Sequence, residues 1–262
     1  MITIQAQHAM RLESEPSLPL WREAFMGADW ISLRVSPVYY GFGVPLGDGS
    51  PVIVIPGFLG SDNYLIELYN WLRRIGYRPY YSRIGLNADC LNILMQRIFV
   101  SMDQAYEETG RKLHLIGHSL GGVLARSAAT QRPDQVAQVI TLGSPFRSIK
   151  AHPFIIRASD WVRDSKIRNR REKGEVPPDC YTDQCPCQTA AALRSGLPKQ
   201  IERLAIYTKV DGVVDWGCCV EEDPSCNVKV FSTHAGLAFH RDSFTAIANK
   251  LAECEVEDYF SA

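Results

Sequence analysis

Short apolar runs alternate with longer amphipathic stretches along the chain, a rhythm typical of alternating β-strands and α-helices. The unbroken β-branched run Pro51-Val52-Ile53-Val54-Ile55 predicts a strand buried on both faces. Further strands are predicted over 77–83, 113–117, 136–142, 204–210 and 228–231. Helices are predicted over 21–30, 63–75, 91–107, 120–132 and 242–251. This order predicts an α/β fold in which a mainly parallel sheet has helices on both faces.

The alternation is interrupted between residues 147 and 199, where we find no strand pattern. We predict that 147–199 is an inserted lid or cap, that 51–146 and 200–262 form the core, and that 1–50 is a lead-in packed on the core. A basic run in the insertion has two interpretations, the solvent-facing side of a lid helix or attraction to an anionic interface. The run comprises Arg163, Lys166, Arg168, Arg170, Arg171 and Lys173.

The pattern G-x-S-x-G stands between the predicted strand 113–117 and the helix that follows, as Gly117-His118-Ser119-Leu120-Gly121. This order of strand, motif and helix is typical of a tight turn that exposes a nucleophilic serine. The flanking positions of such a turn leave almost no room for a side chain, which explains Gly117 and Gly121. The sequence therefore predicts Ser119 as a nucleophile.

An acid and a base follow later strands. Asp211 comes after the strand at 204–210, and His234 comes after the one at 228–231. Because the carboxyl ends of parallel strands share one edge of a sheet, we expect both to meet Ser119 there. Imidazole would take the serine proton, and the carboxylate would hold the ring and stabilise the imidazolium. Asp215 and His240 are the alternatives for the two positions.

Four segments, IPGFLGSD, LIGHSLGG, KVDGVVDW and STHAGL, resemble the α/β-hydrolase superfamily and, within it, bacterial lipases and esterases. The resemblance implies that fold, with Ser119 as nucleophile, Asp211 as acid and His234 as base. It also implies an oxyanion hole made by the backbone N–H groups of Phe58 and Leu120. Leu59 is the alternative to Phe58. Pro-Gly stands before the oxyanion residue, where the family more commonly has His-Gly.

Four residues near these motifs are candidates for a substrate pocket, with core packing as the alternative role for each. They are Leu59, His118, Phe146 and Trp216.

The motifs together predict a serine carboxylic-ester hydrolase that forms an acyl-enzyme and needs no cofactor and no metal. An acyltransferase with the same three residues and a non-catalytic binding protein with the hydrolase fold are the alternatives. The expected substrate is a small-molecule or lipid ester.

The composition of the chain limits the classes of partner that we expect. Among 262 residues, 28 Lys and Arg balance 29 Asp and Glu, so the formal net charge of −1 provides no field to attract nucleic acid. No spanning segment is expected, and contact with a membrane would be transient. Residues 1–20 lack a signal-peptide pattern, which predicts a cytoplasmic protein unless a leader for secretion or the periplasm has been removed. The eight cysteines leave free thiols, loop disulfides and metal ligation open.

Overall fold

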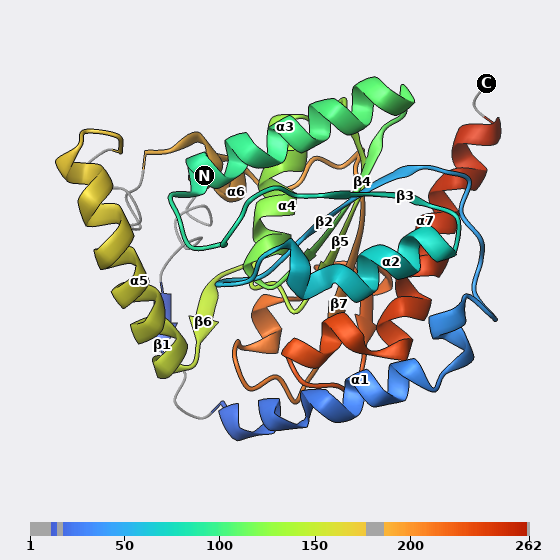
Figure 1. Cartoon of the computed structure of the whole chain (residues 1–262), viewed down its shortest axis with the longest axis horizontal. Coiled ribbons are helices and arrows are strands. Elements are labelled where there is room, and N and C mark those ends of the chain that lie inside the picture. The colour runs from blue at the N-terminus through green and yellow to red at the C-terminus, as the bar shows by residue number, and fades with distance from the viewer. Residues whose placement is uncertain (1–11, 15–17, 177–185, 261–262) are drawn as a thin grey trace, which may run out of the picture.

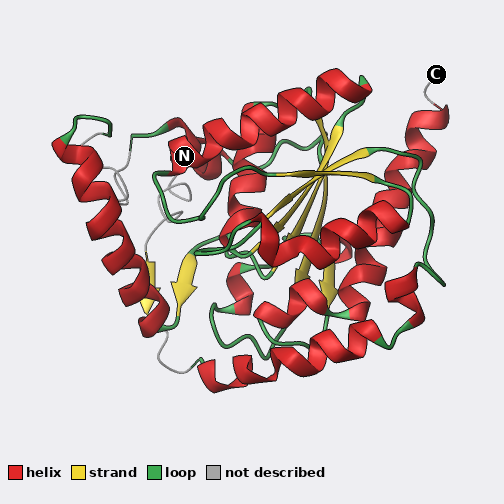
Figure 2. Cartoon of the chain, in the orientation of Figure 1, coloured by secondary structure: helices red, strands yellow, loops and turns green. Residues whose placement is uncertain are grey.

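A six-stranded parallel sheet lies at the centre of the molecule (Figure 2). The computed structural model of the chain describes residues 12–14, 18–176 and 186–260. The strand order is β3-β2-β4-β5-β7-β8, and every neighbouring pair is parallel. The strands are β2 (Pro51–Ile55), β3 (Arg78–Tyr81), β4 (Leu113–His118), β5 (Val136–Leu142), β7 (Glu202–Tyr207) and β8 (Asn227–Lys229). The predicted fold class is confirmed, and each predicted strand is present within a few residues of its expected bounds.

Helices cover both faces of this sheet (Figure 1). The α-helices are α1 (Met26–Arg34), α2 (Ile66–Arg74), α3 (Leu91–Thr109), α4 (Leu120–Gln131), α5 (Pro153–Glu172), α6 (Gln188–Ser195) and α7 (Arg241–Phe260). The 3₁₀ helices are η1 (Leu20–Phe25), η2 (Pro37–Tyr40), η3 (Asp62–Leu65), η4 (Trp216–Cys218), η5 (Pro224–Cys226) and η6 (Ala235–Phe239). In the described part of the chain, no helix is both long and apolar enough to cross a bilayer.

The sequence of β2 explains why the sheet has a core on each face. Side chains alternate along a strand, so Val52 and Val54 enter one hydrophobic cluster while Ile53 and Ile55 enter the other. All of them are at least 97% buried. A strand with two apolar faces can be stable only between two helical layers.

The helices divide between these two clusters. On one face α2 and α7 meet through Trp71 and Phe244, whose ring centroids lie 4.6 Å apart. On the other face α3, α4 and α6 contribute Leu94, Leu124 and Ala190, all fully buried. The loops at the carboxyl ends of the strands are therefore carried on a scaffold packed from both sides.

The segment predicted as a lid contains elements of two kinds. Helix α6 packs against α4 and takes part in the core. Helix α5 lies at the periphery, at the left of Figure 1, and is tied to the start of α3 by a 2.7 Å ion pair between Arg170 and Asp89. The chain between α5 and α6 includes residues 177–185, which lie outside the described part. The boundaries of a lid stay a prediction.

The expectation of no strand between 147 and 199 is wrong in one place. Strand β6 (Ile149–Ala151) pairs in parallel with β1 (Leu12–Ser14), forming a separate two-stranded sheet. A three-residue strand is too short to show an alternating pattern, and its partner lies far away in the sequence. The pairing could not be inferred from the local sequence.

Close packing where α4 meets the sheet leads to a stability prediction. A Cβ atom on Gly121 would overlap the backbone oxygen of Ile55 and lie 2.6 Å from that of Pro56, and neither can move without disturbing β2. We expect Gly121→Ala to lower the free energy of unfolding by about 3 kcal/mol. Gly27→Ala is the control, because nothing lies within 4 Å of the position of its Cβ. It should be neutral or stabilising by up to about 1 kcal/mol. Equal urea midpoints for the two variants would contradict this packing.

Candidate active site

Ser119 is the single residue between strand β4 and helix α4. Its φ of 52° and ψ of −124° lie in a region that residues with a side chain rarely adopt. The neighbouring glycines make this turn possible, since a Cβ on Gly117 would overlap the backbone of Gly122, and one on Gly122 would overlap the Ser144 hydroxyl. The turn therefore exposes the serine at the carboxyl edge of the sheet, as the sequence predicted.

The loop after β2 lies directly against this turn. A Cβ on Gly57 would stand 3.0 Å from the Cβ of Ser119, so the glycine lets the two segments approach closely. The N–H of Leu59 donates to the backbone oxygen of Asn87 at 2.9 Å, whereas Phe58 precedes it in the turn. Because the Leu59 N–H is already paired, Phe58 is the better candidate for the second oxyanion donor.

Asn87 holds this loop in place, a role that sequence analysis did not predict. Its side-chain amide donates to the backbone oxygen of Pro56 at 2.8 Å, and its backbone N–H donates to that of Gly60 at 2.9 Å. Together with the Leu59 bond, these contacts fix both ends of the turn. Asn87 is fully buried, in a stretch after β3 that has no periodic pattern to identify it.

Asp211 and His234 are in direct contact. Nδ1 of His234 lies 2.7 Å from Oδ2 of Asp211, and both side chains are buried. The other carboxylate oxygen, Oδ1, accepts from the N–H groups of Val213 and Val214 at 2.8 Å each. With Nδ1 engaged in this way, Nε2 is the nitrogen of His234 left to act on a serine.

The two alternative residues have other partners. Asp215 caps η4 by accepting from the N–H of Gly217 at 2.9 Å. The Nδ1 atom of His240 accepts from the N–H of Asp242 at 3.1 Å, at the start of α7. The structure therefore brings together Asp211 and His234 and assigns capping contacts to Asp215 and His240.

His118, the residue directly before Ser119, lies against His234. The His118 and His234 rings have centroids 5.0 Å apart, and His118 donates from Nε2 to the backbone oxygen of His234 at 3.0 Å. Among the hydrogen bonds of the described residues, none joins the Ser119 hydroxyl to the His234 ring.

The two histidines have pKa values shifted in opposite directions. Burial, together with the nearby His234, lowers the pKa of His118 to about 3, so His118 is neutral. Burial alone would lower the pKa of His234 as well, but the charge and hydrogen bond of Asp211, with the charge of Glu23, raise it above its usual value. His234 is thus the member of the pair suited to accept a proton.

The four pocket candidates differ in their surroundings. His118 is buried between Tyr64 and His234, which agrees with a packing role. The Leu59 side chain is 43% exposed. Trp216 stacks on Tyr207 with ring centroids 5.6 Å apart.

The guanidinium carbon of Arg126 lies over the ring of Phe146, 3.8 Å from the ring centroid. Phe146 lines a cavity of about 590 Å³ together with Arg126 and its ion-pair partner Glu221. None of Ser119, Asp211 and His234 lines this cavity.

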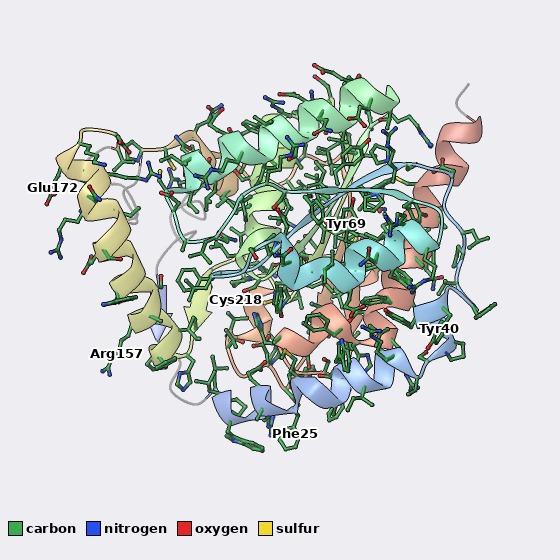
Figure 3. The ribbon with its side chains drawn as sticks, viewed as in Figure 1. Phe25, Tyr40, Tyr69, Arg157, Glu172 and Cys218 are labelled. Atoms are coloured by element: carbon green, nitrogen blue, oxygen red, sulfur yellow. The ribbon has the colours of Figure 1, made fainter. Side chains whose placement is uncertain are left out.

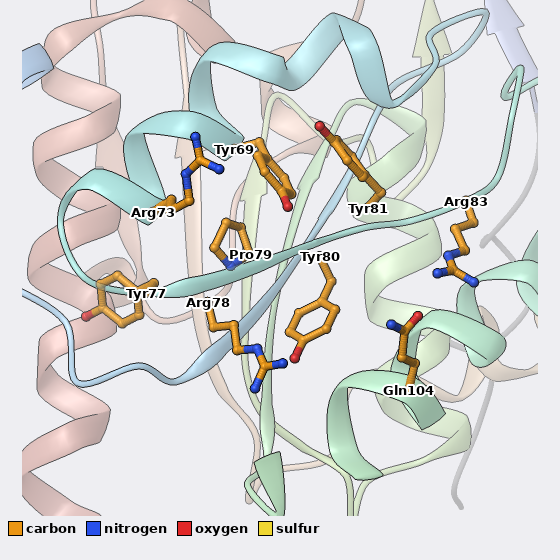
Figure 4. A pocket seen from close by; sticks show the side chains of 9 residues that line it. All are labelled: Tyr69, Arg73, Tyr77, Arg78, Pro79, Tyr80, Tyr81, Arg83 and Gln104. Atoms are coloured by element: carbon orange, nitrogen blue, oxygen red, sulfur yellow. The ribbon is translucent and has the colours of Figure 1, made fainter. Parts of the chain in front are cut away.

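A further cavity of about 410 Å³ lies along the edge strand β3 (Figure 4). Its lining includes the stacked rings of Tyr69 and Tyr81 and the guanidinium groups of Arg73 and Arg78. It too is lined by none of the three candidate catalytic residues, so we do not assign the reaction to it.

Three of the cysteines, Cys218, Cys219 and Cys226, carry free thiols. Burial raises the pKa of the Cys219 thiol well above its usual value, so this sulfur stays protonated. Cys180 and Cys185 lie outside the described residues. In the described part of the chain, no group of three or more His, Cys, Asp or Glu side chains is arranged to hold a metal ion.

Several known proteins resemble this chain in sequence or in fold. A family model described as a PGAP1-like alpha/beta domain matches residues 84–174, which include Ser119. A triacylglycerol lipase of Burkholderia plantarii is 28% identical in an alignment of 147 positions that covers 52% of this chain and 41% of that protein. A triacylglycerol lipase of Pseudarthrobacter phenanthrenivorans is 30% identical in an alignment of 114 positions that covers 40% of this chain and 36% of that protein. The matches span less than half the length of these two relatives.

Solved structures show the same fold. A structure of the metagenome-derived lipolytic enzymes LipS and LipT superposes with a TM-score of 0.55 at 18% identity, covering 81% of this chain and 96% of that one. The mature lipase BlEst2 of Bacillus licheniformis gives 0.51 at 16% identity, covering 80% and 94%. The chain has the α/β-hydrolase fold, and the predicted resemblance to lipases and esterases is confirmed.

The environment of His118 leads to a prediction that needs no substrate. Because its Nε2 atom donates to a carbonyl and its ring is buried, we expect the ring to stay neutral from about pH 8 down to about pH 5, with the proton on Nε2. Nuclear magnetic resonance of the ring nitrogens measures this directly. A titration of His118 near its ordinary pKa would contradict the burial described above.

Proposed function

We propose that this protein is a serine carboxylic-ester hydrolase of the lipase and esterase type. The observation that carries the proposal is the 2.7 Å contact between Asp211 and His234 at the sheet edge where Ser119 occupies its strained turn. Each component alone occurs in other contexts. An acid bound to the far nitrogen of a histidine, next to a serine on such a turn, is the arrangement needed to activate a hydroxyl.

The reaction would begin with attack of the Ser119 oxygen on the ester carbonyl, while Nε2 of His234 takes the hydroxyl proton. Asp211 keeps the proton of the ring on Nδ1 and stabilises the imidazolium. His234 then returns its proton to the leaving alcohol, leaving an acyl group on Ser119. Water activated by His234 releases the acid and restores the serine.

The negative charge on the substrate oxygen would be stabilised by the N–H groups of Phe58 and Leu120. Leu120 is the first residue of α4, where backbone N–H groups have no partner within the helix. Phe58 lies on the loop that Gly57 brings against Ser119. One donor of this kind typically lowers the barrier by about 3 kcal/mol.

For the substrate, we propose a carboxylic ester, with lipid esters favoured by the lipase names of the relatives. Those names favour hydrolysis over the alternatives of acyl transfer and non-catalytic binding. Within the inserted segment, we assign the covering role to α5, since α6 belongs to the core layer.

Removal of the nucleophile tests the proposal. We expect Ser119→Ala to reduce turnover of a chromogenic ester by about 10⁴-fold or more, because no other group replaces the hydroxyl. Ser195 is an exposed serine at the end of α6, so Ser195→Ala is the control and should retain full activity. Unchanged turnover in Ser119→Ala would refute the assignment.

The two aspartates of the loop after β7 give a paired test. Asp211→Asn should lower kcat by about 10³- to 10⁴-fold, since an amide does not stabilise the imidazolium. Asp215→Asn should leave kcat nearly unchanged, because asparagine also caps a helix. Steady-state kinetics on one ester distinguishes them, and a larger loss in Asp215→Asn would reverse the assignment.

A further inference from the structure

The N-terminal segment of η1 and α1 lies along the loops that carry the acid and the base, at the bottom of Figure 1. Glycines allow this approach. A Cβ on Gly212 would stand 2.7 Å from the backbone oxygen of Pro19, and one on Gly236 would overlap the Asp29 carboxylate. The segment therefore fits into space that two glycines leave open beside Asp211 and His234.

Within this segment, Leu33 and the partly buried Met26 pack into the hydrophobic core. Of the side chains of η1 and α1, only Leu33 is fully buried. The large side chains of Trp21 and Phe25 are 67% and 59% exposed, and Figure 3 shows Phe25 on the outer side of the segment. The inner side of the segment makes polar contacts with the acid and base loops.

One carboxylate on that inner side joins both loops. Oε1 of Glu23 accepts from the N–H of Gly212 and from the N–H of His234, each at 3.0 Å. Oε2 accepts from the N–H of Ala235 at 2.9 Å. Gly212 directly follows the acid, and His234 is the base itself. The side chain thus bridges the backbone directly after Asp211 and the backbone of His234, the two residues whose side chains must stay in contact.

A second carboxylate supports the base loop from α1. Oδ2 of Asp29 accepts from the hydroxyl of Ser232 at 2.9 Å and lies 3.3 Å from both the N–H and the hydroxyl of Thr233. Among the described residues, the hydrogen bonds of Asp29 go to the base loop, whereas those of Glu23 go to both loops.

We propose that Glu23 is a positioning residue that sets the distance between Asp211 and His234 by bridging the N–H of Gly212, directly after the acid, and the N–H of the base. The inference rests on the proposed function. A carboxylate can satisfy all three N–H groups because both of its oxygens accept, whereas a glutamine amide has one accepting oxygen. The N-terminal segment is thereby part of the apparatus that aligns the catalytic base.

The charge of Glu23 also acts on the imidazole. The charged and titratable groups facing His234 are Asp211 from the loop after β7, Glu23 from η1 and the neutral His118 from the end of β4. The negative charge of Glu23 favours the imidazolium and raises the pKa of His234. Removing that charge should lower this pKa, so the neutral base would persist to lower pH.

The test compares Glu23→Gln with Glu67→Gln. Glu67, on α2, binds Arg34 and the Tyr39 hydroxyl, so its loss also weakens the attachment of the N-terminal segment but leaves both catalytic loops untouched. We expect Glu23→Gln to lower kcat on a chromogenic ester about 10-fold or more, with a smaller change in KM. The acid limb of its pH profile should move to lower pH. Glu67→Gln should show wild-type kcat and an unmoved limb.

Glu23→Asp separates the effect of the negative charge from the effect of side-chain length. It also provides a second test if Glu23→Gln folds poorly. It keeps the negative charge but withdraws the carboxylate, so we expect an acid limb near that of the wild type together with a reduced kcat. The inference is overturned if Glu23→Gln and Glu23→Asp both behave as wild type, or if Glu67→Gln reproduces their defects.

A readout without substrate keeps this inference distinct from the proposed function. The pKa of the His234 ring is measured by nuclear magnetic resonance in the wild type and in Glu23→Gln. A wild type without esterase activity would refute the proposed function, while a lowered His234 pKa in Glu23→Gln would still support the bridge. An unchanged His234 pKa together with unchanged kcat would refute the bridge in an active enzyme.

Discussion

Ser119 has a backbone conformation that a residue with a side chain rarely adopts, and the packing around the turn makes this conformation possible. The glycines at 117, 121 and 122 remove the atoms that would block the turn, and β2 and β4 supply the rigid floor beneath it. Because a strained turn persists only where its surroundings over-determine it, the packing on both faces of the sheet is a condition for the site.

The other candidate residues are placed by loops rather than by the sheet itself. Asn87 fixes the loop that carries Phe58, two backbone N–H groups fix the carboxylate of Asp211, and Glu23 joins the acid and base loops. These contacts are polar and buried or partly buried, so each loop has one preferred arrangement. The site therefore combines a rigid strand edge with loops that are individually anchored to it.

The sequence was informative where the signal is local. The apolar run at β2 and the motif around Ser119 predicted the sheet and the tight turn at the serine, because buried strands and tight turns constrain the residues that form them. The Asp211 and His234 positions followed from the shared edge of parallel strands. The roles of Glu23 and Asn87 and the pairing of β1 with β6 could not be predicted, since each depends on partners distant in the sequence and none lies in a periodic pattern.

In the mechanism we propose, Ser119 attacks the ester carbon with the help of His234, while the N–H groups of Phe58 and Leu120 bind the oxygen on that carbon. The most direct measurement is a crystal structure of the protein after reaction with an alkyl fluorophosphonate. We expect phosphorus bonded to the Ser119 oxygen, a phosphoryl oxygen within hydrogen-bond distance of both N–H groups, and Nε2 of His234 beside the serine oxygen. Phosphorus on another residue, or a phosphoryl oxygen pointing away from both N–H groups, would contradict it.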